Sequence, residues 1–120
     1  MKNNRKELLK KICEVIEEKK GEQIVILDIS QISSFADFFI LCQGFNQRQN
    51  QAICDGIKER LKNEDHLLPN HIEGYREAEW ILIDYLDCVV HIFLPEAREF
   101  YKLERLWNDG VRLEPESLIA

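Results

Sequence analysis

Residues 80–93, WILIDYLDCVVHIF, contain most of the side chains in this sequence that could do chemistry. Asp84 and Asp87 are two neighbouring carboxylates, and Cys88 is a candidate nucleophile with His91 as a candidate base. Convergent carboxylates suit metal-assisted phosphoryl chemistry, and a thiol within reach of an imidazole suits covalent catalysis. Either reaction needs the paired groups on one face of the structure, so the elements that carry them decide between these alternatives.

The alternation of this segment predicts a β-hairpin with Leu86 and Asp87 as its two-residue turn. One face then carries three opposed pairs: Trp80 and Phe93, Leu82 and His91, and Asp84 and Val89. The other face is uniformly apolar and carries Ile81, Ile83, Cys88, Val90 and Ile92. Cys88 and His91 therefore lie on opposite faces, and the two aspartates diverge across the turn. This register disfavours catalysis by either pair.

The mixed face of the hairpin leaves two interpretations open. Asp84 and His91 are costly to bury unless they find partners. Either the face is half covered and these two side chains pair with each other, or it is an exposed platform. Trp80 has the same alternatives, because large aromatic residues fill cores and also anchor interfaces.

Residues 63–79, NEDHLLPNHIEGYREAE, form the least regular region and predict turns with at most a short edge strand. His66, His71 and Glu73 suggest a metal ion as one alternative. No second pair of ligands stands at a fixed helical or knuckle spacing, however, so we expect surface histidines and no metal site.

The cysteines are spread along the chain without any C-x-x-C spacing, and each lies in an apolar run. They are Cys13, Cys42, Cys54 and Cys88. This pattern predicts buried, reduced thiols rather than disulfides or zinc ligands.

The other elements follow from apolar periodicity and turn residues. They are a helix over 4–20, strands over 22–30 and 37–44, a helix that starts after Asn46, and a helix from Pro95 to Asp109. Asn46 can cap its helix, with Gln49 three residues on. A phosphate-binding loop at Gly44 is a weak alternative, because Phe45 takes the place of a second glycine.

Length and composition limit the classes of function. The 120 residues predict one domain over 1–110 and a loose tail over 111–120. The charged N-terminus lacks the apolar centre of a secretory signal, which predicts a cytoplasmic protein. A net charge of −6 argues against binding to phosphate backbones and favours a basic protein as partner.

Four blocks in this order resemble the ribosomal silencing factor family, also called Iojap. They are ADFFILCQG (36–44), RQNQAICDGI (48–57), EGYREAEWILIDYLDCVVHIF (73–93) and REFYKLERLW (98–107). The resemblance implies a single α/β domain with a mixed sheet of about five strands flanked by helices, similar to nucleotidyltransferases without their activity. The signature of those enzymes, Gly-Ser followed by Asp-x-Asp, is not met, because Phe45 follows Gly44 and two residues separate Asp84 from Asp87.

The same resemblance implies a translation repressor without cofactors. Such a protein binds the large ribosomal subunit through its protein number fourteen, sterically blocks joining with the small subunit, and forms a homodimer when free. A nucleotidyltransferase-like enzyme or nucleotide-binding protein is the alternative. The implied partner contacts are Glu73, Gly74, Trp80, Leu82, Asp84, Tyr85, Asp87 and His91. The family commonly has glycine where Leu86 stands, which leaves a wider turn and another register open.

Overall fold

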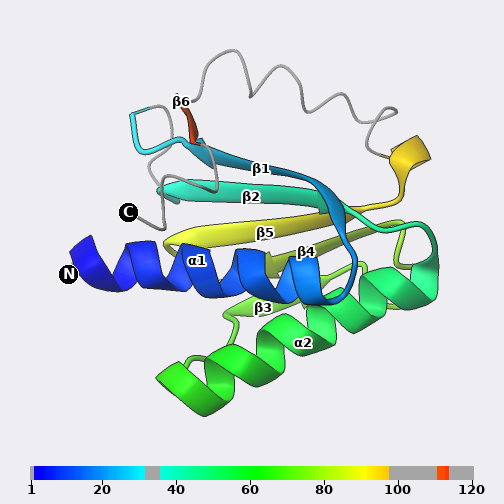
Figure 1. The fold of residues 1–120 in the computed structure, drawn as a ribbon, viewed down its shortest axis with the longest axis horizontal. Coiled ribbons are helices and arrows are strands. Elements are labelled where there is room, and N and C mark those ends of the chain that lie inside the picture. The colour runs from blue at the N-terminus through cyan, green and yellow to red at the C-terminus, as the bar shows by residue number, and fades with distance from the viewer. Residues whose placement is uncertain (1, 32–35, 98–110, 114–120) are drawn as a thin grey trace.

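The structure, a computed structural model, describes residues 2–31, 36–97 and 111–113 (Figure 1). Its elements are α1 (Lys2–Glu18), β1 (Glu22–Asp28), β2 (Phe38–Gln43), α2 (Gln47–Asp65), β3 (His71–Glu73), β4 (Trp80–Asp84), β5 (Cys88–Phe93) and β6 (Val111–Leu113). The helices and strands predicted before Pro95 are present, with ends within a few residues of the predicted ones. The helix predicted from Pro95 to Asp109 lies mostly outside the described residues.

The strands form one mixed sheet in the order β3-β4-β5-β2-β1-β6. β2 and β5 run parallel at its centre, and every other pair of neighbours is antiparallel. The predicted mixed α/β sheet is thus confirmed, with one strand more than the sequence predicts.

The additional strand, β6, lies in the segment that was expected to be a loose tail. Its residues pair antiparallel with Ile26 to Asp28 of β1, so Val111 lies opposite Asp28. Three residues are too few to show an alternating pattern, but their backbone groups satisfy hydrogen bonds at the open edge of β1. Val111–Leu113 therefore belong to the sheet, whereas residues 114–120 lie outside the described part of the chain.

Both helices cover the same face of the sheet (Figure 1). Their buried residues recur at helical spacing: Leu9, Ile12, Cys13, Val15 and Ile16 from α1, and Ile53, Cys54, Ile57 and Leu61 from α2. This stripe packs on sheet residues such as Ile40, Ile81 and Val90 and forms the main core. Within the described ranges, neither helix is long and apolar enough to cross a bilayer.

The opposite face of the sheet carries a second apolar cluster. Its buried members are Val25, Leu27, Ile29, Ala36, Phe39, Leu41, Val89 and Phe93. Trp80 and Leu82 of β4 pack against it and are half-buried. The central residues of β1 and β2 alternate between the two clusters, so these two strands are buried on both faces of the sheet.

The turn between β2 and α2 is organised by side-chain hydrogen bonds. Asn46 caps α2 as predicted, and its Oδ1 accepts a hydrogen bond from the Gln49 amide at 2.8 Å. The Gln49 side chain accepts from the Phe45 amide at 2.6 Å, one residue earlier than in a capping box. A Cβ on Gly44 would overlap the Oδ1 of Asn50, so packing alone is a sufficient reason for glycine at this position.

Candidate partner-binding surface

The register of the β4–β5 hairpin is the one predicted. Trp80 pairs with Phe93, Leu82 with His91, and Asp84 with Val89. The loop keeps two residues, because the Tyr85 amide donates to the Cys88 carbonyl at 2.9 Å. Leu86 takes the strained backbone that glycine would supply, with φ of 73°, and the Asp87 amide donates to the Tyr85 carbonyl at 2.9 Å, so the chain turns tightly around Leu86.

The Asp84 side chain stabilises this turn by a hydrogen bond to the backbone of the turn. Its Oδ1 accepts a hydrogen bond from the Leu86 amide at 2.8 Å, which ties the carboxylate to the strained residue. Its other oxygen lies 3.6 Å from Nδ1 of His71 on β3. The alternative in which Asp84 pairs with His91 is therefore wrong, because the turn and the neighbouring strand supply the partners of Asp84.

His91 pairs with Trp80 instead. The indole Nε1 donates to Nδ1 of His91 across the hairpin, at 3.0 Å. The imidazole is buried, with Phe39 edge-on at 4.7 Å between centroids and Phe93 stacked at 6.0 Å. Burial lowers the pKa of His91 to about 4, so the ring is neutral near pH 7. Because Nδ1 accepts, the ring proton resides on Nε2.

The strand pairing brings five side chains to one face, which we call the β3–β4 face: His71, Glu73, Trp80, Leu82 and Asp84. Glu73 lies opposite Leu82, and His71 lies opposite Asp84. Trp80 and Leu82 are half-buried, whereas Glu73 and His71 are exposed. The face thus combines partly accessible apolar surface with two carboxylates.

Gly74 has a backbone role at the end of β3. It has φ of 77°, and a Cβ there would overlap the backbone carbonyl of Trp80. Its own carbonyl accepts a hydrogen bond from the Ala78 amide at 2.9 Å. Gly74 therefore lets the loop before β4 turn tightly and sets where Trp80 begins its strand.

Helix α2 holds this loop through residues that the sequence analysis did not single out. Nδ2 of Asn50 donates to the Ala78 carbonyl at 2.8 Å in the core, and Nε2 of Gln51 donates to the Tyr75 carbonyl at 2.9 Å. The Tyr75 hydroxyl donates to the carboxylate of Asp55 at 3.0 Å. Asn50 stands on the inward stripe of α2, one turn before Ile53, and a polar residue at such a position was the available signal.

Two of the implied contact residues are buried and cannot form a surface themselves. Tyr85 is 5% exposed and packs in the core below the helices, on the face opposite Trp80. His91 is 4% exposed. Strand alternation explains why Tyr85 is buried. It directly follows β4 and continues the pattern of Ile81 and Ile83, whose side chains point toward the helices. The other candidate, Asp87, is exposed in the turn, and its carbonyl accepts from the Asp37 and Phe38 amides.

The groups that could have done chemistry are not brought together. Cys88 lies in the helix-side core, across the sheet from His91, and burial raises its pKa. All four cysteines are free and buried, as predicted, and burial raises the pKa of Cys13 to about 12 and that of Cys54 to about 11. In the described ranges, no three His, Cys, Asp or Glu side chains are placed to hold a metal ion.

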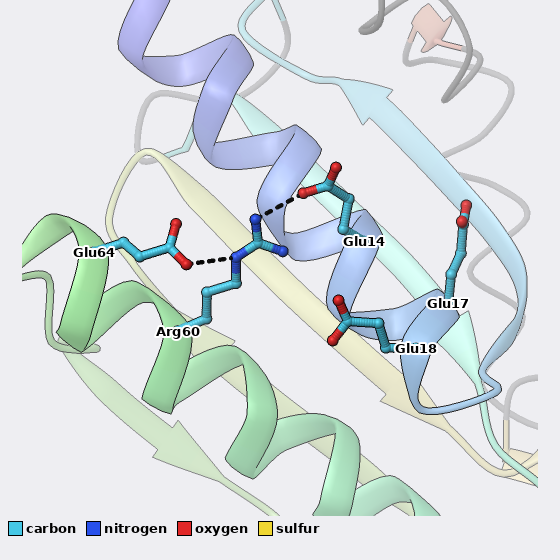
Figure 2. A pocket seen from close by; sticks show the side chains of 5 residues that line it. All are labelled: Glu14, Glu17, Glu18, Arg60 and Glu64. Atoms are coloured by element: carbon cyan, nitrogen blue, oxygen red, sulfur yellow. Dashed lines mark hydrogen bonds and ion pairs between the residues drawn. The ribbon is translucent and has the colours of Figure 1, made fainter.

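A separate hollow lies between the two helices, on the other side of the sheet from the β3–β4 face (Figure 2). It is lined by Glu14, Glu17, Glu18, Arg60 and Glu64. Arg60 bridges the helices, with Glu14 at 2.8 Å and Glu64 at 3.0 Å. Only the pair with Glu14 joins the two helices, because Glu64 lies on α2 with Arg60, and both pairs are partly exposed and so contribute little to stability.

The sequence is similar to a protein-family model and to named relatives. The family model described as "Ribosomal silencing factor during starvation" matches residues 2–119. A ribosomal silencing factor from Halalkalibacterium halodurans is 40% identical over 114 residues, covering 95% of this chain and 97% of that protein. A mouse relative named "Mitochondrial assembly of ribosomal large subunit protein 1" is 25% identical, and the match covers 43% of its length.

A solved structure shows the same fold. The crystal structure of a protein from Chromobacterium violaceum superposes with a TM-score of 0.80 at 35% identity, covering 85% of this chain and 84% of that one. The family match spans the helices, the whole described sheet and the β3–β4 face. This chain belongs to the ribosomal silencing factor family.

Proposed function

We propose that this protein represses translation in the cytoplasm by binding the large ribosomal subunit through its protein number fourteen. The bound protein would occupy the surface that the small subunit needs, so that the subunits cannot join. No bond is made or broken in this mechanism, and it requires no cofactor. The family membership and the name of the mouse relative, which refers to the ribosomal large subunit, support the large subunit as the partner, whereas its protein number fourteen is chosen from the family resemblance alone.

The observation that carries the proposal is the composition of the β3–β4 face. Trp80 and Leu82 offer partly accessible apolar area, and the carboxylates of Glu73 and Asp84 stand on the same face. An aromatic anchor with acidic groups at its rim suits a partner that presents apolar and basic side chains. The net charge of −6 adds long-range attraction to a basic ribosomal protein.

Charge reversal on two faces tests which surface is used. Glu73→Lys changes an exposed carboxylate on the β3–β4 face, and Glu17→Lys makes the same change in charge on an exposed residue of α1. Affinity for purified large subunits is then measured by co-sedimentation at low and moderate salt. We expect Glu73→Lys to weaken binding by about tenfold and Glu17→Lys to have a much smaller effect. Equal losses from the two variants would point to net charge alone and would count against this face.

A further inference from the structure

His91 occupies a buried, apolar position where a polar side chain lowers the stability of the fold. It is 4% exposed, lies among Phe39, Phe93 and Trp80, and its Nε2 has no hydrogen-bond partner within the described residues. A buried polar atom without a partner costs stability, and an apolar side chain of similar size would avoid that cost. Packing alone therefore does not account for a histidine here.

The imidazole acts on the indole of Trp80. The indole ring stacks on Phe93 at 5.4 Å between centroids, with 25° between the planes, which fixes the plane of the indole. The terminal torsion of the tryptophan side chain has broad, roughly two-fold preferences, so a ring flipped by about 180° is a second orientation of the indole in nearly the same plane. Only one flip brings Nε1 to within 3.0 Å of Nδ1 on His91. The hydrogen bond therefore favours the observed orientation over the flipped one.

Resting on the function proposed above, we propose that His91 is a positioning residue for partner binding that holds the Trp80 indole in one orientation. His91 does not touch the partner in this role. It acts through Trp80, whose Nε1–H is directed to the imidazole and is not offered outward.

This arrangement also specifies the chemistry that the partner meets at Trp80. With its N–H satisfied by His91, the accessible part of the indole offers ring carbon surface and its π-electrons. Aliphatic stems and cationic heads of lysine or arginine pack well on such a surface, and Asp84 and Glu73 on the same face favour the same side chains. We thus expect a basic side chain of the partner to lie against the indole.

Two substitutions at position 91 separate positioning from packing. His91→Leu fills the apolar site but offers no acceptor to the indole N–H, so the two effects oppose each other and its stability at pH 7 should stay close to that of the wild type. His91→Asn keeps an acceptor near the position of Nδ1 but leaves a small cavity, so it should be less stable. If His91 positions the indole, the more stable variant, His91→Leu, should bind purified large subunits more weakly than His91→Asn. We expect about a tenfold loss for His91→Leu and less than about a threefold loss for His91→Asn.

Nuclear magnetic resonance of the free protein reads the hydrogen bond directly. The indole N–H proton of Trp80, assigned through Trp80→Phe, should lie at lower field than in an unbonded indole and should lose this shift in His91→Leu. In His91→Asn, the indole N–H proton should keep most of this downfield shift. In the Trp80→Phe background, His91→Leu should cause no further loss of affinity, because the two residues act as a unit.

The outcomes distinguish the two claims. The inference is overturned if His91→Leu binds like the wild type, if affinity follows stability across both variants, or if His91→Leu leaves the indole signal unchanged. Failure of the wild type to bind large subunits would instead overturn the proposed function and the partner role of His91 with it. The indole signal would still show whether His91 holds the ring.

Discussion

The backbone of Gly74 passes so close to Trp80 that a Cβ on Gly74 would overlap the carbonyl oxygen of Trp80. Gly74 also has φ of 77°, a conformation that side chains rarely adopt. The glycine next to Glu73 therefore acts on the candidate surface through the backbone. It allows the loop from β3 to fold back and place Trp80 at the first position of β4.

Gly74→Ala should be strongly destabilising, by about 2 kcal/mol or more, because the new methyl group meets both the positive φ and a backbone atom that cannot move aside. Chemical denaturation of the purified variant measures this loss. Gly74→Asn is the control, since asparagine tolerates positive φ but still carries a Cβ. We expect asparagine not to rescue the loss. A stable Gly74→Asn protein would show that φ alone matters and that the close approach is not as described.

Leu86→Gly should stabilise the protein. Leu86 has φ of 73° and is 60% exposed, so glycine removes strain and sacrifices little buried surface. The gain should be about 1 kcal/mol, reduced somewhat by the greater freedom of glycine in the unfolded chain. Asp87→Gly in the same turn is the matched control, because Asp87 is not among the described residues with positive φ and should gain nothing. The account of the turn is wrong if both substitutions have the same effect on unfolding by denaturant.

Stability should depend on pH through His91. Burial lowers its pKa from 6.5 to about 4 in the folded protein, so between these values the unfolded chain binds more protons. Folding is therefore penalised progressively as pH falls from about 6.5 to 4, by a total of about 3 kcal/mol. His91→Leu lacks this titration, so the difference in unfolding free energy between wild type and variant should grow in favour of the variant over this range. A difference that stays constant with pH would contradict the burial of a neutral imidazole.

Much of the fold follows from local patterns in the sequence. The stripes of α1 and α2, the cap at Asn46 and the alternation along β4 and β5 each reflect a single element whose period is visible in the residues. Strand parity alone separated Cys88 from His91 and argued against their acting as a catalytic pair. The predicted register of the hairpin is present although position 86 is leucine and not glycine. Leu86 adopts the positive φ itself, and its amide donates a hydrogen bond to the Asp84 side chain.

The contacts between distant segments could not be predicted in the same way. β6 is three residues long and owes its place to the edge of β1, and the bond from Asn50 to Ala78 joins a helix to a loop 28 positions away. A pair between His91 and Asp84 was one of two alternatives left open by the sequence, since both are polar residues on one face. Which acceptor the Trp80 indole reaches depends on how the ring lies against both Phe93 and His91, and no short pattern in the sequence encodes that geometry.

The most direct test of the account is whether Trp80 is needed to bind the large subunit and block joining. Purified large subunits are incubated with wild type or Trp80→Ala protein, small subunits are added, and bound protein and joined ribosomes are separated on a sucrose gradient. The account predicts that wild type migrates with large subunits and reduces joining, and that a folded Trp80→Ala protein binds about thirtyfold more weakly and permits joining. Equal binding and equal inhibition by the folded variant would contradict it.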